Sequence, residues 1–389
     1  MLDKICSVED FRTLARKRVP RMFYDYADAG SWTESTYHQN ERDFRSIHFR
    51  QRVGIDITNR TTTTTLAGED VTMPVALAPV GIAGMQHADG EILAARAAEA
   101  FGIPFILSTM STCSLEDVAT HTAKPFWFQL YILKDRSFSE RLLERARAAG
   151  CKTLVVTLDL TLLGQRHKDI RNNLRAPPKI TPSTLYQFIT RPRWCLNMIG
   201  TGRRSFGNVV GHTQGVSDLS SLASWITEQF DAAFTWKDLE WIRTRWDGPM
   251  IVKGILDPED VPKAIDAGAD IIVVSNHGGR QLDGAPSTIS VLPSILEAAN
   301  GKVEVHLDGG IRSGQDVLKA IALGAKGVHI GRAYIYGLGA CGQAGVTKTL
   351  EIIRNDLTLT MGMLGERDIN QVGQHNLVSD SVQKIRCFT

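Results

Sequence analysis

The chain has 389 residues, of which 43% are apolar and 22% charged, so it can bury a large core. The 44 Lys and Arg residues nearly balance the 42 Asp and Glu residues, and a net charge of +2 gives no reason to expect a nucleic-acid-binding protein. Length alone would suggest two or three domains, but an α/β barrel commonly uses roughly 250 residues or more as one unit.

The N-terminal stretch MLDKICSVEDFRTLARKRVP mixes acidic and basic residues and lacks the apolar segment of a signal peptide. No part of the chain approaches the roughly 18 consecutive apolar residues that a membrane-spanning helix needs. The 6 cysteines are scattered, with neither a C-x-x-C pair nor a zinc-like spacing. We therefore expect a protein of the reducing, cytoplasmic compartment with no signal peptide, no disulfide framework and no metal site.

From residue 74 onward, short apolar runs rich in β-forming residues alternate with amphipathic segments. Several of these segments end in Ala-Gly or Leu-Gly, and glycine is a common helix terminator. Apolar strands that alternate with helices indicate a buried parallel sheet, and an eightfold repeat favours a closed (β/α)8 TIM barrel over a doubly wound sheet. The predicted strands span residues 74–81, 104–110, 126–132, 153–160, 249–255, 270–276, 304–310 and 327–333.

The carboxyl ends of the strands carry the chemistry in barrels of this kind. In this chain these ends are unusually rich in polar residues, and such a density around one rim predicts a catalytic face. The residues at or just beyond the strand ends are Pro79, Val80, Gly81, Ser108, Gln129, Tyr131, Thr157, Asp159, Arg166, Lys253, Ser275, His277, Arg280, Asp308, Arg312, Gly331 and Arg332.

Two segments late in the barrel, DGGIRSGQD and GRA, indicate a phosphate site. Loops seven and eight of such barrels often bind phosphate through backbone N–H groups, helix N-termini and an arginine. The alternative interpretation is that the glycines only form turns and that the arginines face solvent. The chain has no strand–GxGxxG–helix unit, which argues against a Rossmann dinucleotide site. The candidate phosphate residues are Gly309, Gly310, Arg312, Gly331 and Arg332, and Asp308 at the start of the first segment is a further candidate cofactor-binding residue.

Hydrogen-bonding side chains on neighbouring strands, Ser108, Gln129 and Thr157, suit the edge of a flat heterocycle. Lys253 is buried by its position and needs an anion nearby. The N1/O2 edge of a reduced flavin would be a suitable partner, and a Schiff base of the kind that aldolases form is the alternative. A phosphate together with a flat ring suggests FMN, although residue types alone do not name it.

The stretches YDYADAG, FQLYILKDR, VKGI, SNHGGRQLDG and LDGGIRSGQDV resemble the FMN-dependent L-2-hydroxy-acid oxidising family, of the glycolate oxidase and flavocytochrome b2 type. The resemblance runs from about residue 8 to residue 375. Two further stretches, MPVALAPVGIAGM and TWKDLEWIRTRWDGPM, resemble the membrane-associated bacterial L-lactate dehydrogenase branch. The DGGIRSG stretch also resembles inosine-phosphate dehydrogenases, but those enzymes need a catalytic cysteine loop that this chain lacks.

The resemblance implies a role for each matching residue. His277 is the base that takes a proton from the substrate, and Asp159 orients its ring and stabilises the imidazolium. Arg280, Arg166 and Tyr26 bind the substrate carboxylate, and Tyr131 binds the substrate hydroxyl. The backbone of Pro79, Val80 and Gly81 lies beside the flavin, Lys253 stabilises its reduced form, and Ser275 joins the cofactor-binding set.

The implied reaction is oxidation of an L-2-hydroxy acid, foremost L-lactate to pyruvate, with electrons passed from FMN to a membrane quinone or cytochrome. Gly81 stands where the oxidases of the family usually have alanine, which argues against oxygen as the acceptor. Met110 stands where glycolate oxidase has tryptophan, and Leu160, Leu162 and Leu163 make the approach to the site apolar. An oxidase, a dehydrogenase for a bulkier acid such as mandelate, and a catalytically silent binding protein are the alternatives.

The segment between the fourth strand and its helix, residues 164–234, is far longer than an ordinary barrel loop. Residues 170–217 hold seven Lys or Arg and no Asp or Glu. Basic charge with apolar anchors favours peripheral contact with an anionic membrane, at the cytoplasmic face of the inner membrane, whereas an arginine-rich lid is the alternative. The basic residues are Arg171, Arg175, Lys179, Arg191, Arg193, Arg203 and Arg204, and the anchors are Leu185, Tyr186, Phe188, Ile189, Trp194, Leu196, Met198, Ile199 and Phe206.

The predicted organisation is one domain over residues 1–389. It comprises an N-terminal helical cap (1–72), the barrel (73–375) with its inserted loop (164–234), and a poorly ordered tail (376–389). By the resemblance, the cap supplies Tyr26 and closes the bottom of the barrel, and the protein forms a homotetramer. The threonine tract at residues 61–65 is expected to be a strand or connector, with no assigned role.

Overall fold

A closed barrel of parallel strands forms the centre of the protein, whose computed structural model describes residues 2–174, 181–211 and 229–379. The hydrogen-bonded order is β3-β10-β9-β8-β7-β6-β5-β4, and a parallel bridge between Leu77 and Phe105 joins the two outer members. The predicted TIM barrel is confirmed, and every strand lies inside a predicted run. The strands are β3 Val75–Leu77, β4 Ile106–Ser108, β5 Trp127–Leu130, β6 Leu154–Thr157, β7 Met250–Ile255, β8 Ile271–Val274, β9 Glu304–Asp308 and β10 Gly327–Ile330.

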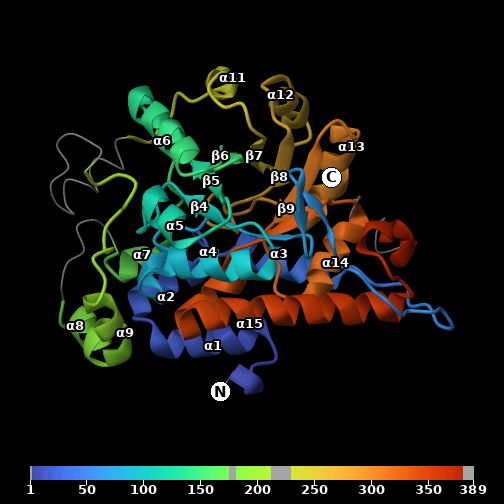
Figure 1. Cartoon of the computed structure of the whole chain (residues 1–389), viewed down its shortest axis with the longest axis horizontal. Coiled ribbons are helices and arrows are strands. Elements are labelled where there is room, and N and C mark those ends of the chain that lie inside the picture. Colours follow the sequence, from blue (N-terminus) through green and yellow to red (C-terminus); the bar gives the residue numbers. More distant parts are fainter. Residues whose placement is uncertain (1, 175–180, 212–228, 380–389) are drawn as a thin grey trace.

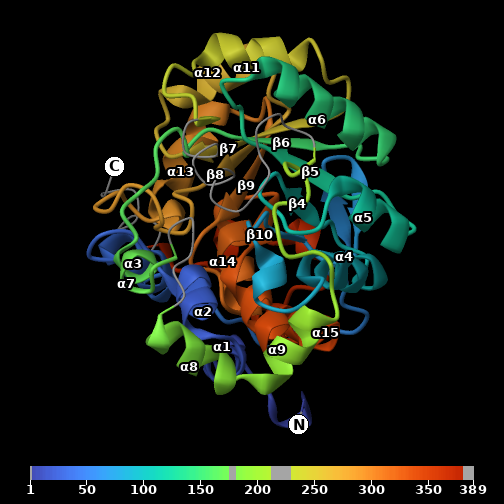
Figure 2. The same cartoon turned by 90° about the vertical axis from the view of Figure 1, so that its left-hand side faces the viewer.

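One helix or more follows each strand, and together these helices surround the barrel (Figure 2). Local signals fix several of their ends: Ser114 and Ser313 accept a backbone N–H at two helix starts, and Gly102 and Gly324, both at positive φ, stand at two helix ends. The helices are α4 Gly90–Phe101, α5 Leu115–His121, α6 Arg136–Ala148, α11 Trp236–Arg243, α12 Asp260–Asp266, α13 Thr288–Ala299, α14 Gly314–Leu323 and α15 Arg332–Leu364.

The amino end of the barrel is filled by apolar side chains and a hairpin. Strands β1 Thr64–Leu66 and β2 Glu69–Val71 pair antiparallel. Leu66 and Val71 pack in one buried cluster with Trp127, Ile251 and other inward-facing strand residues. The threonine tract therefore ends in a short strand that helps to close this end of the barrel.

The cap consists of η1 Leu2–Lys4 and of helices α1 Val8–Arg18, α2 Arg21–Asp28 and α3 Ser35–Arg45. Helix α1 lies along α15 (Figure 1). The turn after α2 crosses to the carboxyl ends of the strands, where the N–H of Ser31 donates to the carbonyl of Gly279 at 2.9 Å. The cap thus reaches the predicted catalytic face as well as the flank of the barrel.

The described part of the inserted loop contains α7 His167–Arg171, α8 Pro182–Ile189 and α9 Pro192–Ile199, which lie beside α2 in both cartoon views (Figures 1 and 2). The N–H of Met22 donates to the Gln187 side chain at 2.9 Å, and the rings of Phe23 and Trp194 stack at 5.3 Å. Within the described residues, no helix has both the length and the apolarity needed to cross a membrane.

The packed part of the chain extends beyond residue 376, where the prediction placed the start of a poorly ordered tail. It forms η3 Ile369–Gln371 and η4 Gln374–Asn376, and Leu377 is buried and bridges to Phe49. The expectation of a loose tail from residue 376 is therefore wrong for its first residues, because Leu377 buries an apolar side chain that sequence position alone did not reveal. Residues 380–389 lie outside the described part of the chain.

Candidate active site

His277 and Asp159 meet at the carboxyl ends of β8 and β6. The imidazole Nδ1 lies 2.8 Å from the Asp159 carboxylate Oδ1. Because a carboxylate only accepts, Nδ1 carries the proton and Nε2 is left to accept one. Burial of the ring favours the neutral imidazole and outweighs the attraction of Asp159, so the pKa of His277 is lower than usual. A histidine that is neutral near pH 7 and braced by a carboxylate can act as a general base.

Lys253 lies beneath this pair as a buried cation. Its Nζ is 3.1 Å from Asp308 Oδ2, 2.8 Å from Ser275 Oγ and 4.0 Å from Asp159 Oδ2. Burial favours the neutral amine, but Asp308 and Asp159 outweigh it and raise the pKa of Lys253. The amine is therefore protonated, which suits an electrostatic role and argues against the Schiff base, since that reaction needs a free amine.

The side chains predicted to hold a substrate carboxylate converge from three parts of the chain. Arg280 follows β8 and lies over the ring of Tyr26 on α2, 4.7 Å from its centroid. Arg166 precedes α7, and its Nε is 3.5 Å from the carbonyl of Arg280. Burial and the positive charge of Arg166 lower the pKa of Arg280. Two side chains whose positive charges repel each other favour a bound anion nearby.

Tyr131 follows β5 and is buried beside these groups. Burial, together with the negative charge of Asp159, raises the pKa of Tyr131, so its hydroxyl stays protonated and can donate. The ring of Phe230, from the end of the inserted loop, stands edge-on to Tyr131 at 6.0 Å. Gly81 lies close by, since a Cβ added there would be 3.3 Å from the Tyr26 hydroxyl.

Two buried polar atoms at the strand ends suit a flat heterocycle. Gln129 Nε2 and Thr157 Oγ1 have no hydrogen-bond partner among the described residues. The other end of the Gln129 amide is fixed, because Ser108 Oγ donates to its oxygen at 3.1 Å. A buried donor without a partner costs about 1–3 kcal/mol, so these atoms imply a ligand that pairs with them. Ring nitrogen and carbonyl groups, such as those of FMN, fit this requirement.

The predicted phosphate end of the site combines glycines with arginines. Gly309 and Gly310 adopt positive φ, and a Cβ on Gly310 would overlap the carbonyl of Asn40 in the cap. Arg312 Nη2 is 2.8 Å from Glu41 Oε1. Helix α15 begins directly after Gly331, and a helix N-terminus offers free N–H groups to an anion.

The Arg332 side chain makes structural hydrogen bonds that the sequence did not predict. Its guanidinium donates to the carbonyls of Ala27 at 2.9 Å, Ala29 at 2.8 Å and Gly278 at 2.9 Å. The side chain therefore ties the cap to the loop that carries His277. The phosphate role predicted for Arg332 then depends on its backbone N–H, which stands at the start of α15.

Three other residues at the site were not predicted from the sequence. Gln281 Nε2 donates to the carbonyl of Asp159 at 2.8 Å, which holds the loop after β6. Asn40 and Asn276 exchange side-chain hydrogen bonds of 2.9 and 2.8 Å between α3 and the His277 loop. Gln281 and Asn276 stand within SNHGGRQLDG, so the motif marked them, but nothing in the sequence marked Asn40, the partner of Asn276.

Comparison with known proteins agrees with this geometry. Residues 15–379 match the family described as FMN-dependent dehydrogenase. The L-lactate dehydrogenases of Chromohalobacter salexigens and Actinobacillus pleuropneumoniae serotype 5b are 46% and 45% identical to this chain. These matches cover 97% and 96% of this chain, and 96% and 98% of the relatives.

Solved structures of other proteins are also similar to this chain. An (S)-mandelate dehydrogenase, described as a monotopic membrane protein, superposes with a TM-score of 0.92 at 35% identity, over 96% of this chain and 99% of the other. A mandelate oxidase variant superposes with a TM-score of 0.81 at 35% identity, over 96% and 98%. These matches confirm the predicted family and cofactor: the chain belongs to the FMN-dependent dehydrogenases and is an oxidoreductase whose cofactor is FMN.

Proposed function

We propose that the protein oxidises L-lactate to pyruvate and passes the electrons to a membrane quinone or cytochrome. The observation that carries this proposal is the His277–Asp159 pair beside Arg280, since a base next to a carboxylate-binding cation is what a 2-hydroxy acid requires. FMN, when bound, would accept the C2 hydrogen together with its two electrons, while the hydroxyl proton goes to the protein. Lactate dehydrogenases among the relatives support the choice of acid.

The side chains of this chain hold and deprotonate the substrate. Arg280 and Arg166 bind its carboxylate, with the Tyr26 hydroxyl as a further donor. Tyr131 donates to the substrate hydroxyl, and His277 Nε2 takes the hydroxyl proton. Asp159 then stabilises the imidazolium at 2.8 Å, and Lys253 holds a positive charge beneath the ring-binding atoms of Gln129 and Thr157.

Mandelate is the second candidate substrate. The approach to the site passes Leu162 and Leu163, which are 72% and 52% exposed, and Met110 lines the end of β4. Methionine adapts its shape readily and would leave room for a larger side chain. The likeness to (S)-mandelate dehydrogenase supports this option.

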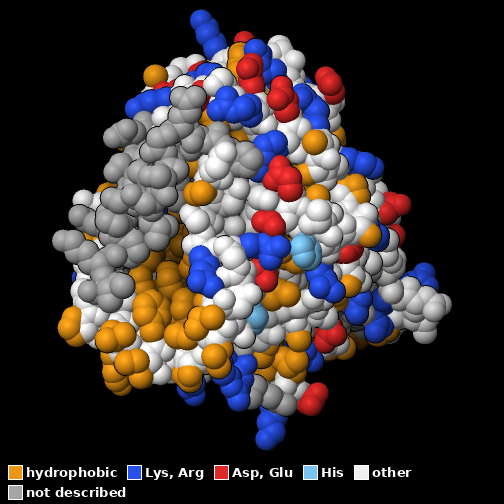
Figure 3. Space-filling model, turned by 60° about the vertical axis from the view of Figure 1, so that its left-hand side comes forward, with side chains coloured by type: hydrophobic (Ala, Val, Ile, Leu, Met, Phe, Trp, Pro, Cys, Tyr) orange, Lys and Arg blue, Asp and Glu red, His pale blue; other side chains and the backbone are white. Residues whose placement is uncertain are grey.

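Helices α8 and α9 are proposed as the membrane contact. Apolar side chains gather on this face of the molecule (Figure 3), including Leu185, Tyr186, Ile189, Leu196 and Ile199, all at least 52% exposed. Such a surface suits a helix pair lying in the interfacial layer. The monotopic neighbour supports peripheral attachment, and the cytoplasmic face of the inner membrane is our proposal for its side.

Not every predicted anchor contributes to this apolar surface. Phe188 and Trp194 stack on each other at 5.6 Å. Trp194 also stacks on Phe23 of the cap and donates to the carbonyl of Met85 at 3.0 Å, so these rings pack against the rest of the protein. Arg203 pairs with Asp117 at 2.8 Å and with Asp89 at 3.1 Å, which makes it a structural link. Arg175 and Lys179 lie outside the described residues.

The first experiment is an anaerobic titration of the purified holoenzyme, followed by the flavin absorption in the visible range. We expect L-lactate to bleach the flavin faster than L-mandelate does, and a quinone analogue to restore the colour. Rapid recovery with oxygen and none with the quinone would indicate an oxidase instead. A flavin that neither acid bleaches would refute the substrate proposal.

A further inference from the structure

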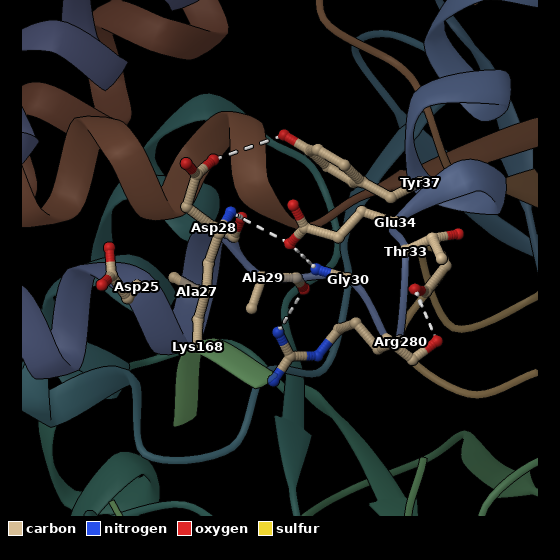
Figure 4. Close-up of polar contacts among 12 residues, drawn as sticks. Asp25, Ala27, Asp28, Ala29, Gly30, Thr33, Glu34, Tyr37, Lys168 and Arg280 are labelled. Atoms are coloured by element: carbon tan, nitrogen blue, oxygen red, sulfur yellow. Dashed lines mark hydrogen bonds and ion pairs between the residues drawn. The ribbon is translucent and has the colours of Figure 1, made fainter. Parts of the chain in front are cut away.

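The carboxylate of Asp28 is buried at the end of α2, and the reaction described above does not use it. Four side chains from different helices donate to it, and Figure 4 shows one of them, Tyr37, above the carboxylate. Asp28 itself is 7% exposed. The donors are Arg12 at 3.1 and 3.2 Å, Tyr24 at 3.2 Å, Tyr37 at 3.3 Å and Tyr336 at 2.5 Å.

The backbone around Asp28 holds the two arginines of the site. The carbonyl of Ala29 accepts from Arg280 at 3.0 Å (Figure 4) and from Arg332 at 2.8 Å. Arg280 also donates to the carbonyl of Tyr26, and Arg332 to that of Ala27. The end of α2 is thus the shared acceptor for both guanidinium groups.

The same two arginines connect α2 to the base. Arg332 donates to the carbonyl of Gly278, next to His277, and its guanidinium lies 4.4 Å from the ring centre of Tyr37. His277 itself has a φ of +57°, a conformation that a non-glycine residue adopts only where its surroundings enforce it. The Ser31 N–H adds a hydrogen bond to the carbonyl of Gly279.

We propose that Asp28 is a positioning residue for the substrate-binding arginine and the base loop, because it fixes the end of α2, to whose carbonyls Arg280 and Arg332 donate. The proposal rests on the roles proposed above for His277 and Arg280. Asp28 touches neither the substrate nor the cofactor. It acts by fixing the position of the backbone carbonyls that accept hydrogen bonds from Arg280 and Arg332.

The charge of Asp28 matters because its partners include the guanidinium of Arg12, which can only donate, and three hydroxyls that donate to it. Replacement by Asn keeps the volume but puts an NH2 group against hydroxyl and guanidinium donors, so part of the cluster loses its acceptor. Lys168 of α7 donates to the backbone carbonyl of Asp28 at 3.2 Å and pairs with Glu34 at 2.9 Å, and neither contact depends on the side-chain carboxylate. We therefore expect the Asp28→Asn holoenzyme to fold with α2 in place but its last turn loosened.

The test compares Asp28→Asn with Asp25→Asn, a matched change on the same helix whose carboxylate contacts Arg21 and Asn172 instead of the cluster. Oxalate binding, followed by its effect on the flavin spectrum, reports Arg280 without turnover. We expect Asp28→Asn to weaken oxalate binding and raise KM for L-lactate by about tenfold, with FMN retained, since small displacements of binding groups have effects of this size or more. Asp25→Asn should stay within about twofold of the wild type.

A purely structural role would lower the melting temperature of Asp28→Asn and leave oxalate affinity and KM unchanged at a temperature well below melting. That outcome would overturn the proposal. Tyr336→Phe is the second variant, because it removes one hydroxyl from the cluster and leaves the ring. We expect it to weaken oxalate binding about threefold, as loss of one hydrogen bond does. If Asp28→Asn does not fold, unchanged oxalate binding in Tyr336→Phe overturns the proposal.

The outcome also separates this inference from the proposed function. A wild-type flavin that L-lactate does not bleach contradicts the proposed reaction, whatever the variants do. A wild-type enzyme that is bleached by lactate and binds oxalate, beside an Asp28→Asn enzyme that binds oxalate equally well, contradicts only the role of Asp28.

Discussion

The Nδ1 atom of His277 lies 2.8 Å from the Asp159 carboxylate, although 118 residues separate the two in sequence. The two residues follow strands β8 and β6, which both pair with β7, so the parallel sheet brings their carboxyl ends close together. The pair fixes the tautomer of the imidazole and leaves Nε2 able to accept a proton. In the proposed reaction, proton abstraction depends on both residues, in different ways.

Removing each member of this pair should have a distinct effect. We expect His277→Gln to abolish flavin reduction by L-lactate while FMN stays bound, because glutamine cannot take a proton. Asp159→Asn should keep the base but leave the imidazolium without its carboxylate, and slow flavin reduction on the order of 10²- to 10⁴-fold. Stopped-flow absorption measures both. Turnover by His277→Gln at more than a few per cent of the wild-type rate would remove His277 from the role of base.

The pH dependence follows from the direction of the His277 pKa. Burial lowers it below the ordinary value of 6.5, and the neutral imidazole is the active form. The rate constant kcat/KM should therefore rise with pH and level off with a midpoint below 6.5. In Asp159→Asn the partner that raises this pKa is gone, so the midpoint should move to still lower pH while the plateau falls. A midpoint above 6.5 in the wild type would contradict the assignment.

Lys253 should be essential for both stability and the cofactor. Replacement by Met leaves Asp308 and Asp159 without their buried cation, and breaking such a pair costs about 3–5 kcal/mol. We expect Lys253→Met to melt at a clearly lower temperature and its flavin to have a lower reduction potential. Adding Asp308→Asn to Lys253→Met should restore part of the stability. Lys263→Met, which removes an exposed lysine paired with Asp260, serves as the control.

The sequence predicted the barrel well because its signals are local and repeated. Each strand is a short apolar run, and residues at the run's end must lie at the carboxyl rim, so the positions of Lys253, His277 and Asp308 on that rim follow from the sequence alone. The tertiary partners of these residues do not. Nothing near Asp28 in the sequence indicates that Tyr336, 308 residues away, donates to it.

Side-chain direction on the inserted loop was also beyond the sequence. Trp194 and Leu196 are two residues apart in one helix, yet the tryptophan packs on Phe23 and the leucine is 68% exposed. The prediction from apolar composition treated both residues as membrane anchors. The buried face of a short helix is set by the element against which it packs. For α9 that element is α2, which is distant in sequence, so the sequence around Trp194 does not reveal the buried face.

A substitution at Gly81 tests how closely the proposed site fits its substrate. A methyl group there would stand 3.3 Å from the Tyr26 hydroxyl, which must yield by a few tenths of an ångström, and would touch Met110 at 3.4 Å. We expect Gly81→Ala to raise KM for L-lactate several-fold and for L-mandelate by more, with little change in melting temperature. Gly202→Ala is the matched control, because nothing lies within 4 Å of its added methyl. Equal KM values in Gly81→Ala and the wild type would show that the substrate does not reach this residue.

The membrane contact can be tested without deleting the loop. Deletion of residues 182–206 would also remove Gln187, Trp194 and Arg203, which hold α2 and the barrel helices. Leu196→Glu combined with Ile199→Glu changes only side chains that are 68% and 71% exposed. We expect this variant to lose sedimentation with phosphatidylglycerol vesicles and keep wild-type activity with a soluble dye acceptor, because a charge in the interfacial layer opposes insertion.

Val53→Glu is the control for that experiment, since Val53 is 83% exposed but precedes the barrel and lies outside α8 and α9. It should sediment with vesicles as the wild type does. If the α8–α9 variant also sediments normally, the apolar surface is not the membrane contact. Loss of activity with the soluble acceptor would instead mean that the substitutions disturb α2, which contacts these helices through Met22 and Phe23 and carries Tyr26.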